Sequence, residues 1–169
     1  MALPRKLKLM NVFVNGTSYL GQATEVTLPK ISMKTEDYRA GGMMGEVAIN
    51  MGIEKLEMEI KFGGFMSEIH KMFGNAKIDG VPLRFAGAYQ REDTGEVDAV
   101  EIVVRGRITE IDGGSSKVGD NTEETIKFAL TYYKEDMAGS TNMEIDLVNN
   151  VFVVAGDDKL AAARQAIGM

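Results

Sequence analysis

The clearest pattern in the chain is a strict alternation of apolar and charged residues over residues 55–62, "KLEMEIKF". A period of two is typical of a β-strand that buries one face and exposes the other to water. The stretch therefore predicts a strand with one apolar and one charged face. The apolar face consists of Leu56, Met58, Ile60 and Phe62, and the charged positions are Lys55, Glu57, Glu59 and Lys61.

The stretch just before it alternates in the opposite phase. Its apolar positions are Val47, Ile49, Met51 and Ile53. Because a shift of one residue moves every side chain to the other face of a strand, the two stretches cannot form one regular strand. We therefore expect a turn or a bulge near residues 52–54.

Similar alternation predicts strands along most of the chain. Residues 81–89 and 97–111 form an expected hairpin around the turn "REDTGE", and Asn15-Gly16 fits a type I′ hairpin turn. Pro29 suggests an edge or a bend, and the glycine-rich residues 112–122 suggest a polar loop. The other expected strands cover residues 8–14, 23–33, 124–133 and 142–154.

Two short helices interrupt this pattern. Residues 67–74 place Ile69, Met72 and Phe73 on one face, with Ser67 as an expected N-cap and Gly74 as a stop. A second helix is expected in residues 157–168, capped by one of the two aspartates at its start and ended by Gly168. The predicted fold is a single, mainly antiparallel β domain over residues 1–169, with a short central helix and a C-terminal helix.

Composition excludes several classes of protein. The chain has no cysteine, which excludes disulfides and thiolate metal sites and fits synthesis in a reducing compartment. The net charge of −6 argues against a surface that grips nucleic acid. No apolar run is long enough to span a bilayer, and the basic start lacks a signal-peptide cleavage site, so no membrane anchor is expected.

Candidate catalytic chemistry is sparse. His70 is the only histidine and lies in an amphipathic helix, where a surface or boundary role is the common one. The acidic loop around Asp112 and Asp120 does not follow the EF-hand spacing, and the glycines at 41–45 lack the Lys and Ser/Thr of a phosphate loop. Glu57 and Glu59 could pair as in a glycosidase, yet a solvated strand face is the commoner arrangement. No catalytic residue, cofactor or metal is therefore predicted.

The stretch "YRAGGMMGEV" at residues 38–47 combines three glycines with two adjacent methionines. Glycine frees the backbone, and methionine adapts to irregular apolar contacts. The hypothesis is that Tyr38, Arg39, Met43 and Met44 contact another subunit; the alternative is a mobile loop packed on its own domain.

For the whole chain, two functions remain open. One is a self-assembling structural subunit, and the other is a small β-barrel module that binds a ligand or a carbohydrate.

Several segments then point to a family. They are "MALPRKLKLMNVFVNG", "SYLGQATEVTLPK", "EDYRAGGMMGEV", "GGF", "PLRFAGAYQREDTGE", "VRGRITEID" and "AIGM". Together they resemble the major tail tube protein of contractile-tailed phages, in the branch that includes R-type bacteriocin tubes. The resemblance implies a non-enzymatic virion protein, made in the host cytoplasm, that forms stacked hexameric rings around a channel. It also implies contacts with the tail sheath, baseplate and tail terminator, and in a phage the transient passage of DNA.

Within that family, the residues suggest two further surfaces. Glu57, Glu59 and Lys61 are predicted to line the channel, the alternative being an outer surface beneath the sheath. Arg5, Lys6 and Lys8 are predicted to meet acidic surface on a neighbouring subunit or the sheath, the alternative being a frayed terminus. The sequence does not separate a phage from a headless bacteriocin.

Overall fold

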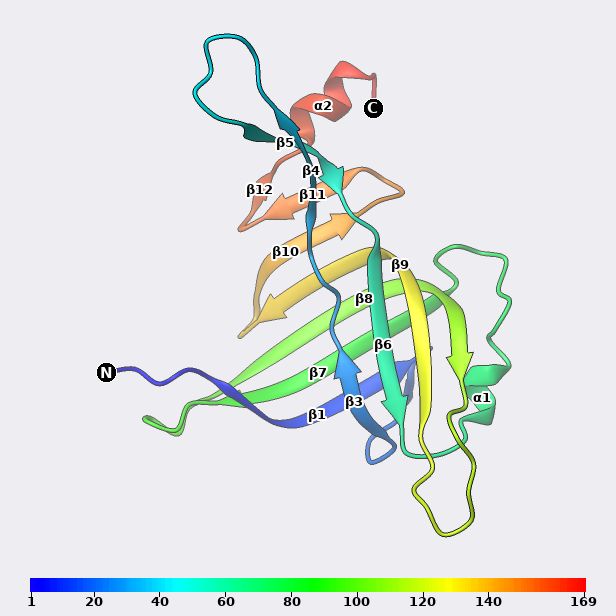
Figure 1. Cartoon of the computed structure of the whole chain (residues 1–169). Helices are drawn as coiled ribbons and strands as arrows, with labels where there is room; N and C mark the ends of the chain where they lie inside the picture. Colours follow the sequence, from blue (N-terminus) through cyan, green and yellow to red (C-terminus); the bar gives the residue numbers. More distant parts are fainter.

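The computed structural model describes all residues 1–169 and consists of twelve strands and two short helices (Figure 1). This confirms the predicted mainly antiparallel β fold. The elements in chain order are β1 (Lys6–Val14), β2 (Thr17–Ser18), β3 (Ala23–Thr27), β4 (Met33–Tyr38), β5 (Val47–Ile53), β6 (Leu56–Phe62), α1 (Ser67–His70), β7 (Val81–Gln90), β8 (Val97–Asp112), β9 (Glu124–Met137), β10 (Ser140–Asp146), β11 (Val151–Val154), β12 (Asp157–Asp158) and α2 (Ala161–Ala166).

Ten of the strands form one antiparallel sheet that branches at β9. The main path runs β12-β11-β10-β9-β8-β7-β1-β2, and β6 and β3 continue from the other part of β9. Residues 132–137 of β9 pair with β10, whereas residues 124–130 pair with β6. The branch folds β6 and β3 over β1, β7 and β8, which creates the two layers seen in Figure 1.

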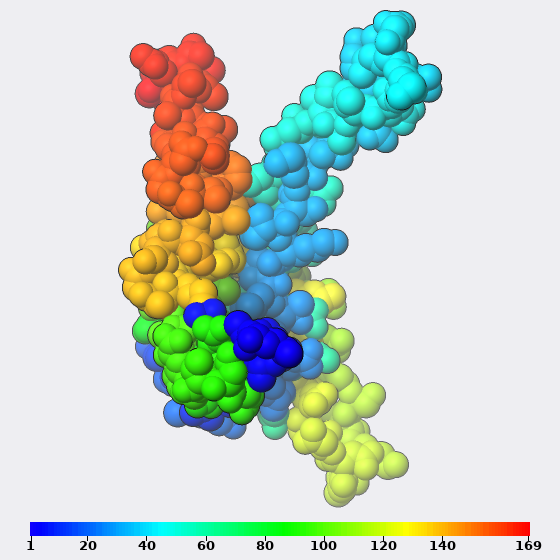
Figure 2. Space-filling model, turned by 90° about the vertical axis from the view of Figure 1, so that its left-hand side faces the viewer, coloured from blue at the N-terminus to red at the C-terminus, as the bar shows by residue number.

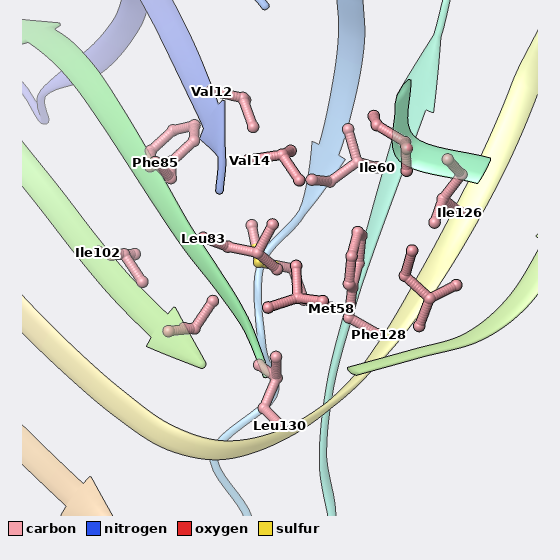
Figure 3. Close-up of a cluster of buried hydrophobic side chains, with 14 of the residues drawn as sticks. Val12, Val14, Met58, Ile60, Leu83, Phe85, Ile102, Ile126, Phe128 and Leu130 are labelled. Carbon is pink, nitrogen blue, oxygen red and sulfur yellow. The ribbon is translucent and has the colours of Figure 1, made fainter. Parts of the chain in front are cut away.

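The hydrophobic core lies between these two layers (Figure 3). Leu56, Met58, Ile60 and Phe62 are all buried, which confirms the apolar face predicted from alternation. The second layer contributes residues such as Leu83 and Phe85 of β7. Burying an aliphatic or aromatic side chain stabilises a fold by about 1.5–3 kcal/mol, so this cluster is the main source of stability.

Backbone geometry confirms the predicted turns. Asn15 and Gly16 have φ of 50° and 80°, as a type I′ turn requires, and they join β1 to β2. β7 and β8 pair from Val81 opposite Gly106 to Gln90 opposite Val97. Gly106 lies against β9 at a register irregularity, where a Cβ atom would come 2.0 Å from the carbonyl oxygen of Ala129. Only glycine fits there.

The predicted helices are shorter than expected. α1 ends at His70 and is followed by turns to Gly74, whose φ of 83° confirms the predicted stop. The N-cap position is Met66, and Ser67 makes no capping hydrogen bond, so the Ser67 cap was wrong. Ile69 is buried as predicted, but Phe73 is exposed because the helix ends before a second turn could bring it to the core.

The prediction for the second helix was also too long at its start. Asp157 and Asp158 pair with β11 as the short strand β12 and are not helical. The Asp158 carboxylate accepts the backbone N–H of Leu160 and pairs with Arg164, which holds the chain in a turn before α2 begins. No residue of α2 is buried.

β4 and β5 form a separate two-stranded sheet that projects from the body. We call residues 33–53 the arm. Figure 2 shows it diverging from the C-terminal segment, with an open cleft between the two. The predicted phase change is confirmed, because β5 ends at Ile53 and β6 begins at Leu56, and Gly52 has φ of 109° in an irregular part of the ladder.

Candidate assembly surfaces

The charged residues predicted to line a channel lie on the outward face of β6, away from the core. Lys61 is 3.5 Å from Glu25 of β3, and Lys127 of β9 is 3.7 Å from Glu110 of β8. We call this surface the polar face. Its charged strand residues are Glu25, Glu57, Glu59, Lys61, Arg107, Glu110, Asp112 and Lys127.

The polar face is mixed in sign. Lys55 lies 2.9 Å from Glu57 at the start of β6, and Lys30 lines the same hollow as Glu57 and Glu59. These flanking lysines bring the face close to neutrality. The hydrogen bond and positive charge of Lys55 lower the pKa of Glu57, which therefore stays ionised at neutral pH. The arrangement is a hydrated, ion-paired surface, and the orientation of this face toward a channel stays a prediction.

The arm carries the four residues predicted to contact another subunit. Tyr38 ends β4, and Arg39, Met43 and Met44 lie in the loop at the tip. The loop is locally ordered, because the Ala40 N–H donates to the Met43 sulfur at 3.2 Å, yet Met44 is 98% exposed. Figures 1 and 2 show the tip projecting away from the body, and contact of these four residues with another subunit stays a prediction.

One face of the arm carries several exposed apolar side chains. Tyr38 lies opposite Val47, Glu36 lies opposite Ile49, and Met51 follows on the same face. Tyr38, Val47, Ile49 and Met51 are all exposed in the free chain. A two-stranded ribbon of this kind is marginally stable in water by itself, and an exposed apolar face commonly marks an interaction site.

The charges of the arm are also unpaired. Every ion pair of the structure lies outside residues 33–53. Most lysines and arginines elsewhere in the chain have a carboxylate partner, so the arm is unlike the body. Its unpaired charged residues are Lys34, Glu36, Asp37, Arg39 and Glu46.

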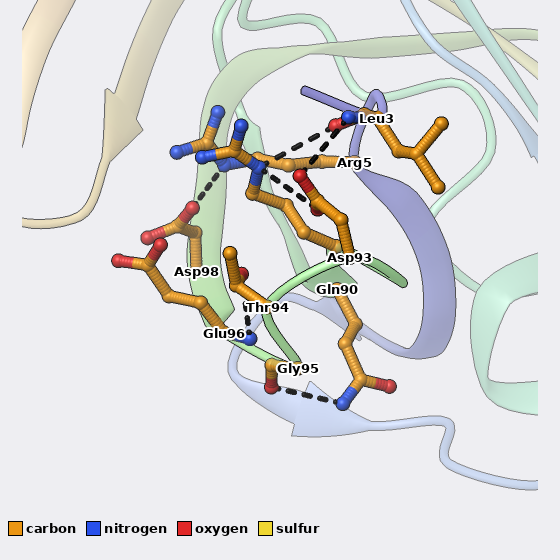
Figure 4. A network of polar contacts seen from close by, with 9 residues as sticks. Leu3, Arg5, Gln90, Asp93, Thr94, Gly95, Glu96 and Asp98 are labelled. Carbon is orange, nitrogen blue, oxygen red and sulfur yellow. Dashed lines mark hydrogen bonds and ion pairs between the residues drawn. The ribbon is translucent and has the colours of Figure 1, made fainter. Parts of the chain in front are cut away.

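The basic N-terminus is held by its own chain. Arg5 pairs with Asp98, and Lys8 pairs with Glu92 on the β7–β8 turn. The Leu3 N–H donates to Asp93 at 3.1 Å and lowers the pKa of that carboxyl (Figure 4). The terminus is therefore anchored, not frayed. Lys6 is the one cation of the three without an ion pair, and contact of the three with a neighbour stays a prediction.

One polar contact was not foreseen. His70 is partly exposed, as a boundary residue should be, but its Nε2 lies 2.5 Å from Oε1 of Glu124. The Glu124 side chain is only 2% exposed, and the two residues are 54 positions apart. No local sequence signal could have joined them, because the contact depends on how α1 packs against the start of β9. The structure has no cluster of three His, Cys, Asp or Glu residues that could hold a metal ion.

The fold is shared with solved structures from contractile injection systems. The structure is similar to the sheath–tube complex of the extracellular contractile injection system PVC in its extended state, with a TM-score of 0.59 at 15% identity, covering 81% of this chain and 93% of that one. It is also similar to the tube-terminating cap of the anti-feeding prophage, with a TM-score of 0.60 at 12% identity over 83% of this chain and 95% of that one.

Sequence comparison makes the assignment more specific. The family model described as phage tail tube protein FII matches residues 4–168. The tail tube protein of Escherichia phage P2 is 49% identical over the full length of both chains. The major tail tube protein of Serratia phage KSP20 is 41% identical, over 90% of this chain and 88% of that one. The chain belongs to the phage tail tube protein family.

The family assignment confirms the predicted class of function. The chain is a structural tail tube subunit and a component of the virion, and the family is not enzymatic. This decides against the alternative of a ligand- or carbohydrate-binding module. Neither helix has the length or the apolar character to cross a membrane.

Proposed function

We propose that the subunit forms hexameric rings that stack into a tube, with the polar face lining the channel and the arm contacting neighbouring copies. The observation that carries this proposal is the division of the exposed surface into two kinds. The polar face is charged and ion-paired, whereas the arm exposes Tyr38, Val47, Ile49 and Met51 and has no ion pair. The polar face is therefore suited to contact with water in a channel, and the arm is suited to contact with another subunit.

A mixed polar face suits a channel through which DNA must slide. A basic wall would hold DNA, because each phosphate that meets a lysine or arginine releases counterions and adds to affinity. On the polar face, Lys61 and Lys127 each have a carboxylate within 4 Å, so their charge is already neutralised. Arg107 and Lys30 have no ion pair, but the five carboxylates of this face, Glu25, Glu57, Glu59, Glu110 and Asp112, balance the five cations, so the wall has no net positive charge to hold a polyanion.

The arm suits assembly because its apolar side chains beyond the base, such as Met44 and Val47, are exposed in the single chain. Contact with a second copy would remove Tyr38, Val47 and Ile49 from water. Each is about half exposed in the single chain, so burial would contribute roughly 1 kcal/mol per side chain. Open strand edges on β4 and β5 could pair at the same time, which is how closed assemblies remove exposed edges.

The tube would have further partners. One structural neighbour was solved in a sheath–tube complex, and others in a baseplate and a tube-terminating cap. By analogy, the outside of this tube would contact a sheath, and its ends would contact a baseplate and a terminator. Both sequence relatives come from phages. Capsid and terminase genes beside the coding gene would assign the chain to a phage, and their absence would assign it to a headless particle.

Assembly is tested by concentrating the purified protein and examining it by negative-stain electron microscopy and sedimentation velocity. Rings or tubes of uniform width are expected, with six-fold symmetry in end-on views. A monodisperse monomer at high concentration, under every salt condition tried, would contradict the proposal.

A further inference from the structure

A second apolar surface lies on the outward face of β1, β7 and β8, opposite the core. It is a groove with a volume of about 500 Å³. Leu9, Leu20 and Val97 form its sides and are 74%, 67% and 57% exposed. Ala86, Ala88 and Ala99 form its floor. We call this surface the apolar groove.

The groove is hollow because small residues meet in register. Leu9 lies opposite Ala88 on one side, and Ala88 lies opposite Ala99 on the other. An alanine floor between long aliphatic side chains leaves space that this chain does not fill. The ion pair between Arg84 and Glu101, at 2.9 Å, and the side chain of Asn11 also line the groove, so its apolar part is bordered by polar groups. A concave surface of this kind, mostly apolar with a few polar groups, commonly marks a site that another molecule covers.

We propose that the tip of the arm of a second copy occupies the apolar groove, with Met43 and Met44 inserted over the alanine floor. The proposal rests on the proposed function, since it names the surface that the arm contacts. Methionine is unbranched and flexible, so it fills irregular hollows that a branched side chain would not fit. At the arm tip, Met44 is 98% exposed.

The charges at the two surfaces are complementary. Lys6 pairs in register with Gln90, which itself lies opposite Val97, so Lys6 and the exposed Glu96 flank one end of the groove. Neither has an ion pair in its own chain. The arm tip carries Arg39 and Glu46 on either side of the two methionines, also unpaired. Docking would pair Glu46 with Lys6 and Arg39 with Glu96, which favours a second copy over an unrelated apolar partner.

The contact is heterologous, because the arm and the groove are different surfaces of the same chain. Each subunit would therefore offer one arm and one groove, and the copies would join head to tail. Such contacts close into rings or continue along a stack, which are the two arrangements that a tube requires.

Engineered disulfides test this contact directly, since the chain has no cysteine of its own. The test variant carries Met44→Cys and Ala99→Cys, and a matched control carries Met44→Cys and Glu59→Cys, whose second thiol lies on the polar face. On mild oxidation of assembled tubes, the test pair should give a ladder of linked subunits in non-reducing gels and the control pair should not. Tubes that form normally but link only through the control pair would overturn the inference while leaving the proposed function intact. If the parent protein forms no tubes, the proposed function fails and this inference fails with it.

A charge exchange provides a second test that does not depend on thiol geometry. Lys6→Glu and Glu46→Lys should each slow assembly about tenfold at low salt, and the double variant should recover most of the rate. If the double variant assembles no faster than two independent tenfold losses would allow, the pairing is contradicted.

Reaction of an Ala99→Cys variant with a maleimide shows which molecule covers the groove. Protection in tubes made of this protein alone supports the arm as occupant, whereas protection only after sheath protein is added would assign the groove to the sheath and overturn the inference.

Discussion

Reversing the charge of the polar face should change how DNA moves through the tube and leave the subunit folded. The substitutions are Glu57→Lys and Glu59→Lys. Both side chains point away from the core, and Glu57 is 65% exposed beside Lys55. An exposed pair of this kind contributes about 0–1 kcal/mol, so its loss should cost no more than about 1 kcal/mol of stability.

The substitutions should change the affinity of the channel wall for DNA far more than they change the stability of the subunit. Each substitution turns one negative charge into one positive charge on a face that is now close to neutral, and the change repeats in every subunit of the tube. For each phosphate that these lysines neutralise, the slope of log K against log salt becomes steeper by about 0.9 for duplex DNA. Because the same contacts repeat along the channel, the affinity of the variant wall for DNA increases with each ring. The variant wall should therefore hold DNA that the parent wall releases.

The assay is genome delivery by particles that carry the variant tube. Adsorption and sheath contraction should be normal, whereas delivery should slow or stall, and more strongly at low salt. A matched control carries Glu57→Gln and Glu59→Gln, which remove the negative charges without adding cations, and should deliver at close to the parent rate. Normal delivery by the lysine variant would refute the assignment of this face to the channel.

Three further predictions concern single surfaces of the subunit. Replacing Met43 and Met44 by Asp should weaken assembly in sedimentation velocity without lowering the unfolding midpoint of the monomer, and assembly at the parental concentration would show that the tip is not an interface. His70→Ala should lower the free energy of unfolding by about 1–3 kcal/mol, because buried Glu124 loses its hydrogen-bond partner, and a change below about 0.5 kcal/mol in urea denaturation would argue against the pair. Gly106→Ala should destabilise by about 1–3 kcal/mol or more, since the added Cβ would overlap a carbonyl oxygen of β9, and an unchanged thermal midpoint would contradict that geometry.

Local patterns in the sequence were enough to predict the strands. The alternation through Leu56, Met58 and Ile60 indicated which face of β6 is buried, because a strand has a strict period of two. The Asn15-Gly16 turn was predictable for a similar reason, since few residues adopt positive φ at two successive positions. Helix starts were less predictable. Asp158 could cap a helix or hold a turn, and pairing with β11 decided the outcome.

Features that depend on distant residues were not predictable from one sequence. The branch at β9, which creates the core, follows from the pairing of β9 with β6, a strand far away in the chain. The partners of Arg5 and His70 lie 93 and 54 residues away. The apolar groove was also missed, because alternation identifies the apolar side of a strand but does not show that Leu9 and Val97 come together over alanines on the outer side.

A cryo-electron microscopy map of tubes assembled from this protein, at a resolution that shows side chains, would locate both surfaces at once. We expect stacked rings of six subunits, with Glu57, Glu59 and Lys61 on the channel wall and Met44 buried against a neighbouring copy. A map with the polar face on the outside of the tube, or with the arm tips free in solvent, would contradict this arrangement.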